Sequence, residues 1–177
     1  MAIQDIAAAM HRVESVLRRR PEMGLHEDPP ATARWQSGTR IASSHSNGTQ
    51  VLTDMPAELG GSGDQVTPGW LFRAGIASCL ATSIAMRAAQ AGIALSALEV
   101  RASSRSDLRG LFGMKDATGE VVCAGPREIQ LVVRIKAHGT PPEQLRNLVE
   151  ESQRCSPMPT ALRNAVPVGL RIEPEVK

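Results

Sequence analysis

The chain has 177 residues, enough for one ordinary domain with an added terminal element and for a sizeable apolar core. It contains no tyrosine and only two Phe and two Trp, which argues against an RNA-binding surface of stacked aromatic rings. The formal net charge of +2, with acids and bases interspersed, argues against a dedicated nucleic-acid or membrane-surface protein.

The first expected element is an amphipathic helix over residues 3–20. Pro21 ends it, and residues 21–30 have the composition of a linker. The sequence therefore predicts an N-terminal helix and linker over 1–30 and one main domain over 31–177. The helix must bury its stripe either on that domain or on a second subunit. The apolar residues that recur every three or four positions are Ile3, Ile6, Met10, Val13 and Leu17.

Residues 31–55 change to a strand pattern. Two β-rich runs, 32–44 and 49–55, are separated by "HSNG", in which Asn-Gly is a strong hairpin signal. The glycine-rich segment 56–68 follows. It is not followed by the Gly-Lys-Ser/Thr of a phosphate loop, so we expect it to serve as a tight connection.

A long apolar helix is expected next. Thr67 suits the N-cap, Pro68 suits the first helical position, and Gly92 suits the end. Alanine and glycine surround most of it, so the pattern predicts a buried helix that carries Cys79 in the interior of the fold. Arg73 and Arg87 interrupt the run, so we do not expect it to span a membrane.

The remaining chain alternates strands and helices. Residues 95–104 and 127–137 read as strands, the second with strict alternation of apolar and polar side chains. Residues 140–155 read as a helix followed by a shorter one, and 167–173 read as a closing strand. This order predicts an α+β fold.

The three cysteines, Cys79, Cys123 and Cys155, form no CxxC pair, and the histidines are scattered, so no zinc site is expected. No signal peptide is evident, which makes the cytoplasm the default compartment and reduced thiols the default state. A buried cysteine is usually a small apolar core residue. Cys155 adds a second thiol beside Arg154, and two thiols that meet could form a redox pair. Cys123 reads as structural.

Three segments carry a family resemblance: "PAELGGSGDQVTPGWLFRAGIASCLAT", "DLRG" and "CSPMPTAL". They resemble the OsmC/Ohr family of osmotically inducible proteins and organic hydroperoxide reductases, over roughly residues 31–173. The resemblance implies an OsmC-like α+β fold in which strands wrap long central helices in an intertwined homodimer. Two active sites would lie at the subunit interface, each with both cysteines from one chain.

By position, the resemblance implies a thiol-dependent peroxidase with Cys79 as the peroxidatic cysteine and Cys155 as the resolving one. Arg40 is the best match for the arginine that holds the thiolate, with Arg34 as second choice. The substrate would be a small organic hydroperoxide and the reductant a dithiol, with no cofactor and no metal. Two departures stand out. Gly69 replaces the family glutamate, and "CSP" replaces a cysteine directly before proline.

Two other readings stay open. The chain could be a non-catalytic OsmC-fold dimer that binds a small apolar ligand or a partner protein, which Gly69 and the extra N-terminal helix favour. A cysteine hydrolase would need a histidine beside a thiol, supplied by the fold from His45 or His138. Neither reading involves nucleic acid or a membrane.

Overall fold

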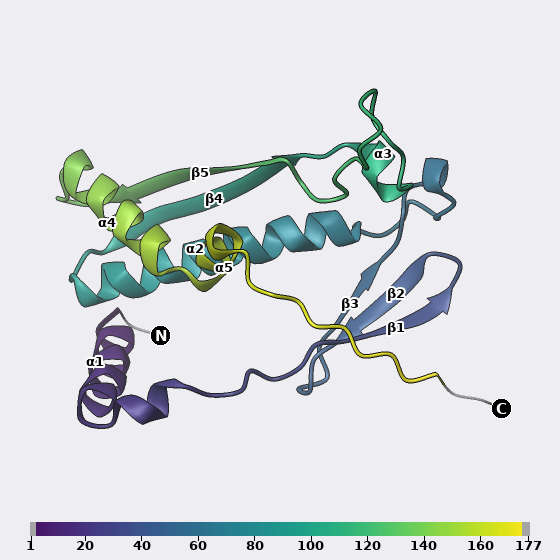
Figure 1. The fold of residues 1–177 in the computed structure, drawn as a ribbon. Coiled ribbons are helices and arrows are strands. Elements are labelled where there is room, and N and C mark those ends of the chain that lie inside the picture. Colours follow the sequence, from purple (N-terminus) through teal and green to yellow (C-terminus); the bar gives the residue numbers. More distant parts are fainter. Residues whose placement is uncertain (1–2, 175–177) are drawn as a thin grey trace.

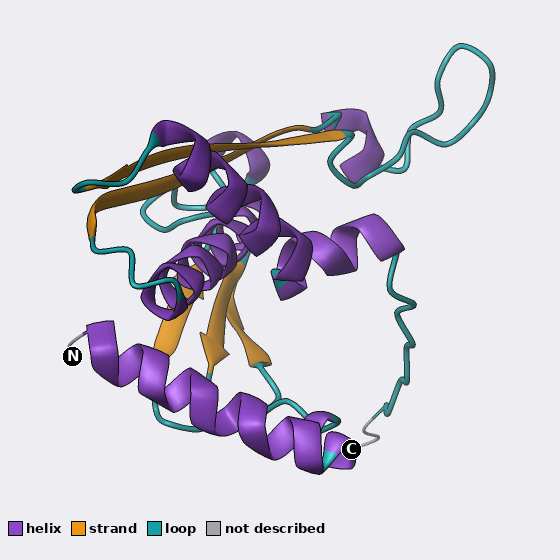
Figure 2. Ribbon diagram, turned by 90° about the vertical axis from the view of Figure 1, so that its left-hand side faces the viewer, coloured by secondary structure: helices purple, strands orange, loops and turns teal. Residues whose placement is uncertain are grey.

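A computed structural model describes residues 3–174 and has an α+β architecture. Its centre is helix α2 (Pro68–Gln90), which lies between a two-stranded ribbon and a separate three-stranded sheet (Figures 1 and 2). Helices α1, α4 and α5 all contact α2. The protein is thus built around one long helix, on which the first cysteine lies.

Local sequence sets both ends of α2. The Thr67 hydroxyl accepts a hydrogen bond from the Trp70 backbone N–H at 3.1 Å, and Pro68 occupies the first turn, as predicted. Gly92, with φ of +67°, turns the chain away after the last turn. The buried side chains recur every four residues on one face, with one neighbour: Ile76, Leu80, Ile84, Ala88 and Ala89.

The expectation that α2 is buried on nearly all sides is wrong for the single chain. Most of its residues are partly exposed, because the ribbon and α4 cover only the face that carries the four-residue repeat. Helix α2 is long and apolar enough to cross a membrane, but the core helices of soluble proteins are often as long and as apolar. In the structure it serves as the packing centre for the other elements.

Strands β4 (Leu95–Arg105) and β5 (Glu128–Ala137) form an antiparallel ribbon whose apolar face covers α2. Val100 pairs with Val133, and alternation puts one side chain in two toward the helix. Helix α4 (Pro142–Cys155) adds Leu145 and Leu148 to the same core. The predicted strand 127–137 and the predicted helix 140–155 are confirmed within a residue or two.

The N-terminal sheet has the order β1 (Thr32–Ser37), β2 (Arg40–Ser44) and β3 (Gln50–Thr53). The prediction of one continuous strand over 32–44 is wrong. Gly38, with φ of +54°, makes a tight turn there, so the segment is itself a hairpin. The sheet lies apart from β4 and β5 (Figure 1), and its outer strand β1 is exposed along its length.

Helix α1 (Ile3–Arg19) confirms the predicted N-terminal helix. It contacts α2, but none of its described residues is fully buried. A short helical turn, η1 (Pro21–Gly24), and an extended linker connect it to β1. The division of the chain at residue 30 stays a prediction.

The closing strand predicted over 167–173 is wrong for the described chain. After α5 (Pro157–Asn164) the chain runs on in extended form without pairing (Figure 2). Val168, Leu170 and Ile172 keep their alternating pattern but are exposed. The pattern is that of a strand, but within residues 3–174 no sheet edge lies beside it to supply the ladder.

Two further short elements position loops. η2 (Ala57–Leu59) follows β3 within the glycine-rich segment, and α3 (Leu108–Leu111) follows β4. Asp107 caps α3 through its carboxylate and also pairs with the Arg109 side chain. "SDLRG" is therefore a capped turn in this chain, held by an ion pair.

Candidate active site

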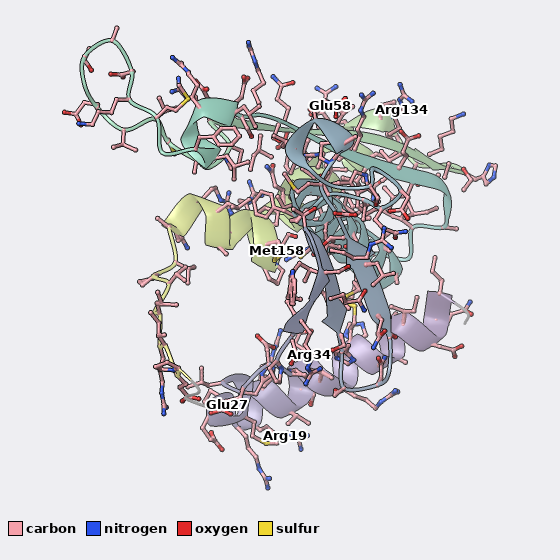
Figure 3. The ribbon with its side chains drawn as sticks, turned by 90° about the vertical axis from the view of Figure 1, so that its right-hand side faces the viewer. Arg19, Glu27, Arg34, Glu58, Arg134 and Met158 are labelled. Atoms are coloured by element: carbon pink, nitrogen blue, oxygen red, sulfur yellow. The ribbon has the colours of Figure 1, made fainter. Side chains whose placement is uncertain are left out.

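Cys79 is half-buried on the face of α2 that meets the junction of α4 and α5. Its Sγ lies 3.3 Å from the Ser156 Oγ, and the backbone N–H of Met158 points to the same sulfur at 3.5 Å. Met158 lies in the first turn of α5, close against the central helix (Figure 3). A hydroxyl and a backbone N–H therefore converge on a sulfur that solvent can still reach in part.

The junction between α4 and α5 fixes the positions of these two groups. Ser156 ends α4 and is also the N-cap position of α5, and Pro157 begins the new helix. The Ser156 backbone is tied on both sides: its N–H bonds to Gln153 and its carbonyl accepts from Thr160. Its side chain does not cap α5, which leaves the hydroxyl for the Cys79 sulfur.

Cys155, the predicted partner of Cys79, is the last residue of α4 and is exposed. Its Sγ accepts a hydrogen bond from the Arg87 guanidinium at 2.9 Å, and Arg87 also lies 3.8 Å from the Glu151 carboxylate. The cation in contact with this thiol is therefore Arg87 on α2. The neighbour in sequence, Arg154, had suggested a different cation. Cys155 precedes Ser156 in the chain, and neither Cys79 nor Cys155 is in a disulfide.

Arg40, the predicted thiolate-holding arginine, lies in a different network. Within residues 3–174 its guanidinium bonds to Asp54, Ser62 and Asp64 and to neither thiol. Arg34, the second choice, lies on exposed β1, and Figure 3 shows it well away from Met158. In the single chain, Arg40 thus joins the end of β3 to the glycine-rich loop.

Asp54 is the centre of that network, with only 3% of its surface exposed. Hydrogen bonds from the Ser62 hydroxyl, the Thr39 hydroxyl and two backbone N–H groups hold the pKa of Asp54 well below its usual range. Ser62 and then Arg40 also lower the pKa of Asp64, and Asp64 raises the pKa of Arg40. Both carboxylates are therefore ionised when the loop is in place.

We expect acid to loosen this network. A carboxyl whose folded-state pKa is depressed stabilises the fold above its unfolded value, which is 3.8 for aspartate, and the stabilisation is lost as pH falls through the folded-state pKa. The melting temperature should therefore decline as pH falls below about 4. Calorimetry from pH 6 to pH 2 measures it. The Asp54→Asn variant should have a lower melting temperature at pH 6 and a smaller decline in melting temperature toward pH 2. Parallel curves for the variant and the wild type would contradict the role assigned to Asp54.

Gly69, at the position of the family glutamate in the resemblance, has room for a side chain. A Cβ built there would lie 3.7 Å from an Arg73 guanidinium nitrogen and 3.9 Å from the Thr67 hydroxyl, both ordinary contacts. Arg73 instead donates to the Ser104 hydroxyl at 3.3 Å. The missing carboxylate therefore does not reflect a lack of space.

Gly69→Glu should accordingly raise stability, by about 0.5 kcal/mol. The new carboxylate would lie in the first turn of α2, where the helix dipole favours an anion, and four residues before Arg73. Urea unfolding measures the change, and Gly69→Gln controls for the uncharged side chain. A loss of stability in Gly69→Glu alone would contradict the expected pairing.

The other candidate residues lie outside this site. Cys123 is exposed, and its backbone carbonyl packs against Gly110, where a built Cβ would come within 2.4 Å of that oxygen. Within the described residues His45 bonds only within its own turn, and His138 is exposed on the loop before α4. Among the residues that the structure describes, no cluster of His, Cys, Asp or Glu could hold a metal ion.

The sequence matches the protein family described as OsmC-like protein over residues 61–171, more than half of the chain. The chain belongs to the OsmC-like family. The match includes all three cysteines, Gly69 and the α4–α5 junction, and it excludes α1 and the N-terminal sheet. A comparison with curated proteins found no match.

Solved OsmC-like structures share the fold. An OsmC-like protein from Mycoplasma pneumoniae superposes with a TM-score of 0.64 at 15% identity, covering 78% of this chain and 89% of its own. An organic hydroperoxide resistance protein from Elizabethkingia anophelis gives 0.58 at 23%, covering 78% and 90%. An organic hydroperoxide resistance protein OsmC from Legionella pneumophila gives 0.53 at 22%, covering 78% and 91%. These likenesses confirm the predicted α+β, OsmC-like fold.

Sequence reasoning missed Ser156, which is the side chain in contact with Cys79. A signal was present: Ser156 stands directly before Pro157, where the resemblance places a cysteine in the peroxidases. The neighbouring thiol, Cys155, drew attention because of its chemistry. The residue that contacts Cys79 is the one before the proline, whereas Cys155 contacts Arg87 on the same helix.

Proposed function

We propose that this OsmC-like protein is a thiol-dependent peroxidase that reduces small organic hydroperoxides, with Cys79 as the nucleophile. The observation that carries the proposal is the setting of its sulfur, which is partly accessible and contacted by a buried hydroxyl and a helix N-terminal N–H. Hydrogen bonds to a thiolate are stronger than those to a neutral thiol, and the thiolate is the form that attacks peroxides. Family membership and the hydroperoxide resistance proteins among its structural neighbours support the same chemistry.

The reaction balances without a cofactor. The Cys79 thiolate attacks one peroxide oxygen, the S–O bond forms and the O–O bond breaks. Sulfur is oxidised to a sulfenic acid, and the hydroperoxide leaves as an alcohol after taking a proton. The Cys155 thiol then attacks that sulfur, forming a disulfide and releasing water. A dithiol reductant restores both thiols and is itself oxidised to a disulfide.

Resolution by Cys155 requires a local movement, because its Sγ is bonded to Arg87. The residue ends α4, where the last carbonyl groups have no partner within the helix, and its thiol has to leave Arg87 before it attacks the Cys79 sulfur. Arg40 is bound to two carboxylates in the single chain, and its predicted role in holding the thiolate stays a prediction.

The proposal includes a homodimer, which the resemblance predicts. Three features support it: the partly exposed apolar helix α2, the unpaired edge of β1, and the alternating tail with exposed Val168, Leu170 and Ile172. Each would gain a partner in a second copy. We also propose that the protein lies in the cytoplasm, where a dithiol reductant would return its redox-active thiols to the reduced state.

The test is a thiol count on the reduced protein before and after one equivalent of cumene hydroperoxide, with peptide mapping by mass spectrometry. Loss of two thiols, with a Cys79–Cys155 crosslink that dithiothreitol reverses, is the expected result. Three unreacted thiols would overturn the peroxidase proposal.

A second candidate function rests on a different observation. An open apolar groove of about 640 Å³ lies between α1 and α2, and it fits the alternative that the protein binds a small apolar ligand. A fluorescent fatty-acid analogue should bind to the full chain and lose binding in Met86→Glu. Equal binding by both would remove this candidate. The groove is lined by Ala9, Met10, Val13, Leu17, Met86 and Gln90, among others.

A further inference from the structure

We infer that Ser156 is a catalytic residue of the proposed reaction: its hydroxyl donates a hydrogen bond to the Cys79 sulfur. The inference rests on the proposed function, because it assigns a role within that same site. Ser156 is completely buried, and its Oγ lies 3.3 Å from the Cys79 Sγ. Among residues 3–174 the hydroxyl has no other hydrogen-bond partner.

Burial makes this contact consequential. A buried hydroxyl without a partner is destabilising, so the Ser156 side chain is committed to the sulfur. A neutral thiol is a weak acceptor, whereas a thiolate is an anion to which hydrogen bonds are markedly stronger. The same hydroxyl therefore contributes little when Cys79 is protonated and more when it carries charge.

The second donor adds to the first. The Met158 N–H lies in the first turn of α5, where backbone N–H groups have no partner within their own helix. Together the hydroxyl and the N–H present two donors to one sulfur from one side. We expect them to hold the thiolate and then the sulfenic acid, whose oxygen comes from the peroxide while the O–O bond breaks.

Ser156 also sets the lifetime of the oxidised sulfur. It occupies the contact position beside Cys79 with an oxygen, which cannot form a disulfide. The Cys79 sulfenic acid therefore persists until Cys155 leaves Arg87 or an external thiol attacks the sulfur. The structure thus predicts a first step that does not require a second cysteine and a slower resolution that does.

The experiment compares the wild type with Ser156→Ala. Ser152→Ala is the matched control, because Ser152 is equally buried on α4 but bonds to the Leu148 carbonyl instead of a thiol. Two rates are followed at Cys79 by mass spectrometry at pH 7: alkylation by iodoacetamide, and oxidation by cumene hydroperoxide with dimedone present to trap the sulfenic acid. Ser156→Ala should slow both rates by at least about tenfold, and Ser152→Ala should leave both unchanged.

The two rates separate the two claims. If Cys79 in the wild type resists peroxide but Ser156→Ala still slows alkylation, the peroxidase proposal fails and the Ser156 contact stands. If Ser156→Ala alkylates and oxidises like the wild type, the inference is overturned while the peroxidase stands. Ser156→Thr keeps a hydroxyl and should restore most of both rates.

A second variant, Ser156→Cys, tests the same contact if the loss of the hydroxyl in Ser156→Ala disturbs the α4–α5 junction. It puts a thiol at the contact position, so peroxide should give a fast disulfide between Cys79 and the introduced thiol, even in a Cys155→Ser background. A dithiothreitol-reversible crosslink at that position supports the contact. Failure to crosslink in a folded variant would contradict it.

Discussion

Replacing Cys79 by serine should abolish peroxide turnover, lowering the rate by at least about 1,000-fold, to that of the protein-free reaction. Sulfur is the atom that the proposed step oxidises, and a hydroxyl at that position is not oxidised by peroxides. The fold should survive, since serine is slightly smaller and can still hydrogen-bond to Ser156 and to the Met158 N–H. Consumption of cumene hydroperoxide with dithiothreitol as reductant measures the loss.

The other two cysteines provide matched controls for this variant. Cys123→Ser should retain full turnover, because Cys123 is exposed and lies beside α3, away from the site. Cys155→Ser should keep the first oxidation of Cys79 and lose the internal crosslink. Full turnover in Cys79→Ser would exclude Cys79 as the nucleophile.

Gly61→Ala should destabilise the fold by about 3 kcal/mol or more, close to the upper end for overpacking. A Cβ at this position would lie 1.8 Å from the Met55 carbonyl oxygen and 2.9 Å from an Asp54 carboxylate oxygen. The obstacle is mostly backbone, and the buried Asp54 hydrogen bonds hold it in place. The loop cannot move aside without breaking them. Urea denaturation with a fixed protein concentration measures the change.

Gly75→Ala is the matched control, because it makes the same chemical change in an open position. Gly75 lies inside α2, and a Cβ there would meet only the end of the Met158 side chain, at 3.8 Å. This variant should be stabilised by about 0.5–1 kcal/mol, since alanine favours a helix interior. Equal effects of the two substitutions would show that the glycine-rich loop tolerates a side chain.

Much of the fold could be predicted because several signals agreed. At α2, the cap residue, the proline and the terminal glycine all marked the ends, and at β5 the alternation was unbroken. The closing strand failed for a different reason. Val168, Leu170 and Ile172 have the right pattern, but a strand also needs a neighbour, which the pattern alone does not supply. The turn at Gly38 was missed because β-rich residues flank it on both sides.

The site was predicted in part. The sequence located Cys79 at the centre of an apolar helix and Cys155 near a helix end, and both positions agree with the structure. It did not show which of two adjacent residues turns toward Cys79. Cys155 is the last helical residue of α4 and contacts Arg87 near the end of α2, whereas the extended backbone of Ser156 turns its side chain to Cys79, eight residues earlier on α2. Cys155 was predicted as the partner of Cys79 because a thiol is reactive, but Ser156 is the residue that contacts Cys79.

The junction between α4 and α5 has a consequence at the level of the gene. Its residues read Cys155, Ser156 and Pro157, and the residue before the proline is the one held against Cys79. Losing the single serine codon would leave a cysteine directly before the proline. An in-frame deletion of three bases would therefore replace the hydroxyl before the proline with a thiol and leave the rest of the sequence unchanged, while Cys155 would leave the end of α4 and its contact with Arg87.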